Sequence, residues 1–348
     1  MLHPTQLPDC AIFLNRILDF QEHLLELGCD RASLTPDDLR DALGEEAFKW
    51  LQSTRDTRKL FEPIYAFSRL PQEEKDVILA DFRHDRQYTD HLEDASFQFH
   101  LLGDVDDQNR QRIKVWLINF YEQFAKSAGI DGTLLRHTSA VGKIEWWQAY
   151  HTKNGGRLTC SVCDGSMNHG MTAEHYLPKS KYPALAIHPH NLLPVCDKCN
   201  SKKGDKDPLN RRTFLEILIP YREDLRSIAH LEFEDDGKGA EIIRIVPQTS
   251  NPEGEAKLST LSELFDLPGQ WQQNIQEIGE IAYRRVRQHF RSLQDEGVII
   301  DPGKIGDHLD RVCGYMERDW GISHYEFPAT EWLRWAKQHK PDTICSQL

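Results

Sequence analysis

Apolar residues recur at helical spacing through most of the first 130 residues. One apolar stripe runs over 12–25 and a stronger, aromatic-rich stripe runs over 109–128. Steps of three and four residues predict helices that each bury one face. A helix start is predicted at Thr35 and Pro36, because threonine can cap the first turn and proline suits the first helical position. Another helix is expected to follow Leu70-Pro71-Gln72-Glu73.

The pattern changes in the last third of the chain. Two short stretches, 230–234 and 241–246, alternate apolar and polar residues, and the glycine-containing run 235–239 lies between them. Alternation of this kind predicts a β-hairpin. Helices are expected elsewhere in this part, with a loop over 247–257: over 210–229 with an interruption at Pro220, over 258–293 with a break at Pro268-Gly269, and as two segments within 303–340.

Four of the eight cysteines form two Cys-x-x-Cys pairs in the middle of the chain. They are Cys160 with Cys163 and Cys196 with Cys199. Two such pairs separated by a long loop are typical of a structural zinc site with four thiolate ligands. A redox dithiol is the alternative, but no thioredoxin-like pattern surrounds either pair. The remaining cysteines are scattered singly, and we expect them to be reduced structural thiols: Cys10, Cys29, Cys313 and Cys345.

Charge is distributed unevenly along the chain. The net charge is −13, yet residues 150–215 hold ten Lys and Arg against five Asp and Glu. A basic segment within an acidic protein is expected where only that segment meets phosphates, although an uneven distribution by chance is the alternative. No run of 18 apolar residues and no secretory leader is evident, so we expect no membrane span and a cytoplasmic location.

The stretch 157–208 resembles the HNH endonucleases, the zinc-stapled branch of the ββα-metal nucleases. Besides the cysteine pairs it contains Glu174-His175 followed by Pro-Lys-Ser, then Asn191-Leu-x-Pro before the second pair, and Asn200-x-x-Lys-Gly after it. The resemblance covers about 50 residues of 348. It implies a metal-dependent hydrolase of phosphodiester bonds in DNA, with RNA left open.

The resemblance also implies a role for each polar residue of the motif. Glu174 and Asn200 would bind a catalytic Mg²⁺ or Mn²⁺ ion, since hard oxygen ligands suit these ions. His175 would be the general base that takes a proton from water. Asn191 would orient the loop that carries His175. Glutamate and Asn200 stand where aspartate and histidine are more usual in the family, and both substitutions keep an oxygen or neutral ligand.

Four lysines of the same stretch are natural phosphate contacts, with solvated side chains as the alternative. They are Lys179, Lys181, Lys202 and Lys203. The nearby imidazoles of His169, His188 and His190 are interpreted as loop residues. The arginines of 284–291 could also touch phosphates, but a solvated helix face paired with acids is the favoured interpretation.

The residues that follow His175 are similar to HNH nucleases of bacterial anti-phage defence of the Septu type. That similarity implies a partner ATPase. Two other functions remain open: a zinc-stapled nucleic-acid-binding module without catalysis, and a subunit of a larger defence complex. A binding module would not need Glu174, His175 and Asn200 together, which favours the nuclease.

We therefore predict an α+β protein that is mostly α-helical. Residues 1–145 would form a helical N-terminal region, and 146–215 a zinc-stapled ββα-metal (HNH) nuclease core. Residues 216–348 would form a mostly helical C-terminal region with one β-hairpin.

Overall fold

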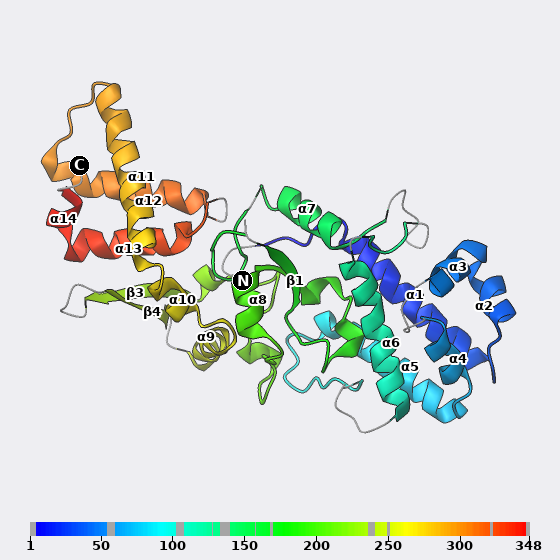
Figure 1. The fold of residues 1–348 in the computed structure, drawn as a ribbon. Coiled ribbons are helices and arrows are strands. Elements are labelled where there is room, and N and C mark those ends of the chain that lie inside the picture. The colour runs from blue at the N-terminus through cyan, green and yellow to red at the C-terminus, as the bar shows by residue number, and fades with distance from the viewer. Residues whose placement is uncertain are drawn as a thin grey trace.

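The computed structural model shows a mostly helical α+β protein with two small antiparallel sheets. It describes residues 5–53, 60–101, 108–126, 128–132, 140–156, 158–167, 170–235, 241–248, 251–320 and 323–345. The N-terminal helices lie at one end, the C-terminal helices lie at the other, and the cysteine-rich segment lies between them (Figure 1). No helix within these ranges is long and apolar enough to cross a bilayer.

The N-terminal region is helical, as its apolar spacing predicts. The predicted start at Thr35 is confirmed, because its side chain accepts a hydrogen bond from the Asp38 backbone N–H at 3.2 Å and Pro36 is the first helical residue. The helices of this region are α1 (Ala11–Asp30), α2 (Pro36–Leu43), α3 (Glu45–Ser53), α4 (Glu62–Ser68), α5 (Gln72–Arg86), η1 (Tyr88–Asp90), α6 (Gln108–Ala125) and α7 (Lys143–Lys153).

The central segment contains two strands followed directly by a short helix. Strand β1 (Met171–His175) pairs antiparallel with β2 (Leu192–Cys196), and α8 (Asp197–Lys203) begins where β2 ends. The loop between the strands contains η2 (Pro183–Leu185) and η3 (Pro189–Asn191). We call residues 158–208 the finger.

The finger contributes side chains to both hydrophobic cores of the molecule. Ala173 of β1 and Leu192 of β2 pack with the N-terminal helices. Leu193 and Val195 of β2 belong to the second core, together with the C-terminal helices. Neighbouring strand residues point to opposite faces, so a two-stranded sheet can be covered on both sides. The finger therefore packs against both the N-terminal and the C-terminal helices.

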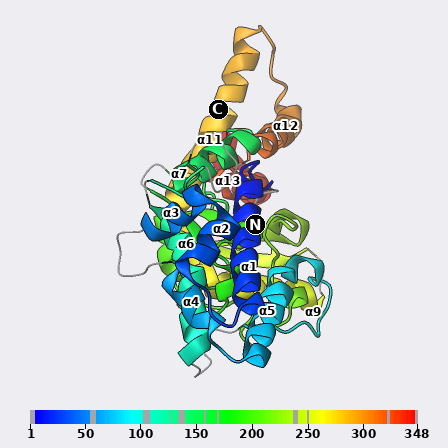
Figure 2. The same cartoon turned by 90° about the vertical axis from the view of Figure 1, so that its right-hand side faces the viewer.

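The C-terminal region contains the predicted hairpin, with β3 (Ala229–Asp235) antiparallel to β4 (Glu241–Pro247). Residues 236–240 of its turn lie outside the described residues. Helices α11 and α12 pack on α13, and the far end of α11 projects beyond the body of the molecule (Figure 2). The helices are α9 (Pro252–Phe265), α10 (Leu267–Gln272), α11 (Ile275–Asp295), η6 (Pro302–Lys304), α12 (Ile305–Arg318), α13 (Glu326–His339) and α14 (Pro341–Cys345).

Three predictions for this region are wrong. No α-helix forms over 210–229, which has only the single turns η4 (Phe214–Glu216) and η5 (Leu225–Ser227). Arg211 and Tyr221 there adopt positive φ angles of 58° and 64°, which a helix does not contain. The predicted loop over 247–257 ends early, because the Asn251 side chain caps α9. The helix break falls at Asp266, with φ 51°, rather than at Pro268.

Candidate functional site

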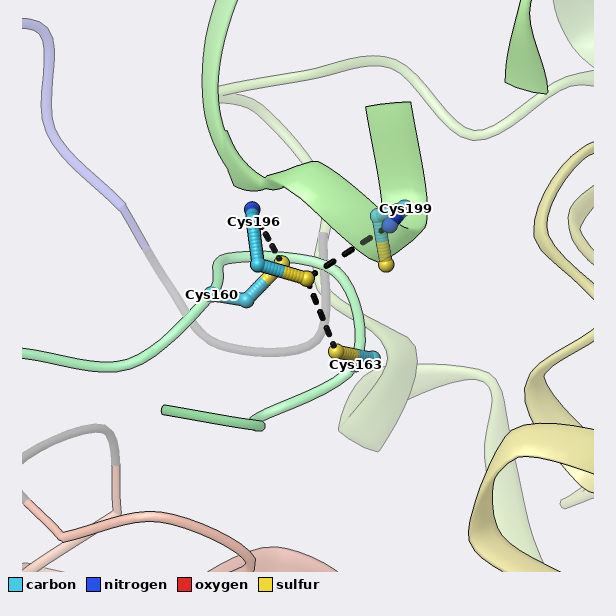
Figure 3. Close-up of side chains that lie close together, drawn as sticks. All are labelled: Cys160, Cys163, Cys196 and Cys199. Atoms are coloured by element: carbon cyan, nitrogen blue, oxygen red, sulfur yellow. Dashed lines mark hydrogen bonds between the residues drawn. The ribbon is translucent and has the colours of Figure 1, made fainter. Parts of the chain in front are cut away.

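The four paired cysteines converge on one point of the finger. Cys160 and Cys163 lie in the loop before β1, Cys196 ends β2, and Cys199 lies in α8 (Figure 3). All four are buried, and their Sγ atoms lie within 4.8 Å of one another. Among the described residues this is the sole group of three or more His, Cys, Asp or Glu side chains close enough to share a metal ion. The cluster is compatible with tetrahedral zinc.

Backbone N–H groups support the sulfur atoms. Gly165 N–H points to Cys163 Sγ at 3.4 Å, Cys196 N–H to Cys160 Sγ at 3.4 Å, and Cys199 N–H to Cys196 Sγ at 3.5 Å. Such donors stabilise thiolates. Hydrogen bonds from the other thiols lower the pKa of Cys196, whereas those that Cys163 makes raise its pKa. Four adjacent thiols cannot all ionise without a cation, and a zinc ion would supply that charge.

His175 ends β1 and is buried, with 6% of its surface exposed. Its Nε2 lies 2.8 Å from the Ala186 carbonyl oxygen. A carbonyl can only accept, so Nε2 carries the proton and Nδ1 carries the lone pair. The ring packs edge-on against Tyr121 of α6, with centroids 4.2 Å apart. Burial, followed by the charge of Lys179, lowers the pKa of His175 to about 3, so the imidazole is neutral.

Asn191 is completely buried and ties the two sides of the loop after His175 together. Its Oδ1 accepts from Leu177 N–H at 2.7 Å, and its Nδ2 donates to the carbonyls of Leu177 at 2.9 Å and Leu185 at 3.1 Å. Its own carbonyl accepts from Tyr176 N–H at 2.9 Å. These bonds hold the chain directly after His175, which is the geometry that an orienting residue requires.

Glu174 forms an ion pair with a lysine of its own motif. Lys203 Nζ lies 3.1 Å from Glu174 Oε1, and the lysine side chain is fully buried. Burial raises the pKa of Glu174 and lowers that of Lys203, and the charge of each partner opposes the shift of the other. A buried ammonium group paired in this way does not reach a phosphate in solvent, so Lys203 differs from the expected DNA contact.

A cleft of about 450 Å³ brings the candidate catalytic residues together. Glu174 and His175 reach it from β1, and Asn200 reaches it from α8. Tyr121 and Asp205 also line it and were not predicted. Asp205 follows the Lys203-Gly204 step and could have been noticed as a carboxylate close to the motif. Tyr121 carries no such signal, because in the sequence it belongs to the apolar stripe of α6.

The other three lysines that were expected to contact phosphates are each paired with an acid. Lys179 pairs with Glu122, Lys181 with Asp207 and Lys202 with Asp266, all at 2.8 Å. Lys179 also lines the cleft, where its Nζ lies 4.2 Å from the centre of the Tyr121 ring. Of these three, only Lys179 therefore lies at the cleft.

The additional histidines have different environments. His188 is buried, and burial lowers its pKa to about 3. His190 is half-buried beside it, with ring centroids 5.7 Å apart. Neither lines the cleft. His169 lies outside the described residues.

The chain is similar in part to a curated protein. Over 37 residues it is 54% identical to Septu protein PtuB of Bacillus thuringiensis. This match covers 11% of the chain and 14% of the relative, so the chain matches about a seventh of that protein's length. No protein family and no solved structure matches the chain.

Proposed function

We propose that this protein is a metal-dependent endonuclease of the HNH type that hydrolyses phosphodiester bonds of DNA. The observation that carries the proposal is the cleft that gathers Glu174, His175 and Asn200 on a strand–strand–helix unit closed by four cysteines. A zinc-binding module has no need for a carboxylate, a tautomer-fixed imidazole and an amide around one hollow. The zinc ion would be structural, since four thiolates leave no open coordination position.

The cleft offers the donor set of a second, catalytic ion. Glu174 and Asn200 would hold Mg²⁺ or Mn²⁺, because carboxylate and amide oxygens are the ligands that these ions prefer. Lys203 Nζ lies 3.1 Å from Glu174 Oε1, so a bound ion would share this carboxylate with the ammonium group. When bound, the ion would polarise the scissile phosphate and stabilise the leaving oxygen.

His175 would act as the general base. Its Nε2–H is held by the Ala186 carbonyl, so the Nδ1 lone pair is the proton acceptor. The pKa of about 3 belongs to the protein without substrate. The negative charge of a bound phosphodiester would raise that pKa and make the base stronger. Asn191 would position His175 through the backbone of residues 176–177.

We further propose that the protein acts in anti-phage defence of the Septu type beside an ATPase partner. The partial identity to a Septu protein supports this assignment, as does the resemblance of the motif to HNH nucleases of such systems.

Cleavage of supercoiled plasmid by the zinc-loaded protein tests the nuclease. We expect nicking with Mg²⁺ or Mn²⁺, none without added divalent ion, and none from His175→Ala. His190→Ala, which changes a histidine outside the cleft, should cut like the unchanged protein. Equal cutting by His175→Ala would refute the assignment of the base.

Mn²⁺ binding, followed by electron paramagnetic resonance, tests the site on the chain alone, even where cleavage depends on a partner. We expect binding that Glu174→Gln and Asn200→Ala each weaken while the zinc content stays constant. A zinc-loaded protein that neither binds Mn²⁺ nor cuts DNA would instead be a binding module or a structural subunit of a complex.

A further inference from the structure

Exposed arginines lie on the outer face of α11. Arg284 and Arg291 are exposed there, and Gln288 lies between them on the same stripe. Within the described ranges neither arginine forms an ion pair, whereas four of the six lysines of the finger do. Arg287, on the same side, has a loose contact of 3.6 Å with Glu280. Unpaired guanidinium groups in an acidic protein are available to an anionic partner.

The stripe borders two adjoining hollows. A hollow of about 410 Å³ lies between α11 and the first cysteine loop of the finger, whose Thr159 and Ser166 form part of its wall. A second, of about 460 Å³, continues along α11 past Arg287 and Arg291. Both are lined by Arg284 and Gln288, so the two hollows adjoin along the stripe, and we call them together the groove. The groove thus begins at the first cysteine loop of the finger and follows α11 toward its C-terminal end.

The helix that carries the stripe is firmly anchored beneath it. Arg285 bonds to the buried Glu326 of α13 through Nε at 2.9 Å and to Asp319 through Nη2 at 3.0 Å. Its guanidinium is therefore occupied inside the fold, and the helix that carries the outer arginines is held in place. A rigid presentation lowers the entropic cost of binding an extended partner.

We propose that this groove binds the phosphate backbone of duplex DNA, as a second contact for the substrate of the proposed nuclease. The inference rests on that proposed function for its choice of substrate. Arg284 and Arg291 are seven residues apart, about 10 Å along the helix, and this distance spans about three phosphates of one DNA strand. Guanidinium groups suit the site because they bind phosphate oxygens in pairs.

The alternative is a solvated helix face whose arginines are balanced by acids. Acidic residues do border the stripe, with Glu280 before it and Asp295 at the outer end of the groove. Glu277, one turn further back, is paired with His324 at 3.0 Å. The acids therefore lie at the two ends of the stripe. Arg284 lines both hollows, and Arg291 lines the second one.

Fluorescence anisotropy with a labelled DNA duplex tests the groove. The zinc-loaded His175→Ala protein, free of other divalent ions, would be compared with the same protein carrying Arg284→Gln and Arg291→Gln. We expect the Kd of the double variant to rise by at least about tenfold near 0.1 M salt. The slope of log K against log salt should become shallower by about 2, because each phosphate that is no longer neutralised lowers it by close to 0.9.

The matched control carries Lys304→Gln and Arg311→Gln. Both side chains are exposed and line neither hollow, and the two substitutions remove the same charge as the test variant. An equal rise in Kd for control and test variants, or no binding by the parent protein, would overturn the inference. Tighter, arginine-dependent binding of duplex RNA would overturn the choice of DNA. Arginine-dependent DNA binding by a protein that neither binds Mn²⁺ nor cuts DNA would support the groove and refute the nuclease. Unchanged DNA binding by the double variant, together with His175-dependent cleavage, would refute the groove and leave the nuclease.

Discussion

The buried ion pair between Glu174 and Lys203 makes a quantitative prediction about stability. Its two charges lie 3.1 Å apart, with the lysine side chain fully buried and that of Glu174 13% exposed. Lys203→Met removes the ammonium and leaves the carboxylate uncompensated, and Glu174→Gln does the reverse. Both substitutions keep the approximate shape of the side chain, so the change in free energy reports mainly the charges.

The magnitude follows from the competition between attraction and desolvation. At 3.1 Å, two unit charges attract by about 5 kcal/mol with an effective dielectric constant near 20. Burial costs several kcal/mol for each ion, so the pair as a whole contributes little. Removing one partner leaves the burial cost of the other, and we expect each single variant to lose about 3–5 kcal/mol. The double variant should lose clearly less than the sum of the two.

Urea unfolding of the zinc-loaded protein measures these values, and a neighbouring pair provides the control. Lys202 and Asp266 lie 2.8 Å apart but have side chains that are 40% and 48% exposed. Lys202→Met should cost less than about 1 kcal/mol, because exposed pairs are screened by water. A loss below about 1 kcal/mol for Lys203→Met, or additive losses in the Glu174 and Lys203 variants, would refute the buried charge pair.

Three further predictions concern the finger. Cys199→Ser should lower the zinc content measured by atomic absorption and lower the melting temperature, whereas Cys345→Ser, at an exposed thiol, should change neither. Asn191→Ala removes three side-chain hydrogen bonds from a buried site and should cost about 2–4 kcal/mol in urea unfolding. The pKa of His188 is lowered to about 3 by burial, then by His190 and Arg86, so the stability that it contributes is complete above pH 6.5 and is lost as the pH falls. Between pH 7 and pH 5 its share of the loss is about 2 kcal/mol, and His188→Phe should flatten the stability profile by that amount.

The parts of the site that follow from local spacing could be predicted from the sequence. The Cys-x-x-Cys pairs bring four sulfur atoms together, because each pair forms one tight turn and β1 pairs with β2 in between. Glu174 and His175 lie on β1 as adjacent strand residues, and both reach the cleft because the strand ends there. The cap at Thr35 is equally predictable, since it depends on residues within one helical turn.

Contacts between distant segments could not be predicted, and they change the electrostatics of the site. The finger has a surplus of basic residues in the sequence, which predicts a surface for phosphates. In the fold, Lys179 meets Glu122 of α6 and Lys202 meets Asp266 near α10, so acids from both flanking regions neutralise lysines of the finger. The net charge of a segment in the sequence therefore does not predict the charge of its surface in the fold, because acids from other segments pair with its lysines. Arg284 and Arg291 of α11 line the groove and lie outside the motif, and among the described residues neither forms an ion pair. DNA binding through them would depend on the tertiary structure, which the spacing of the motif does not predict.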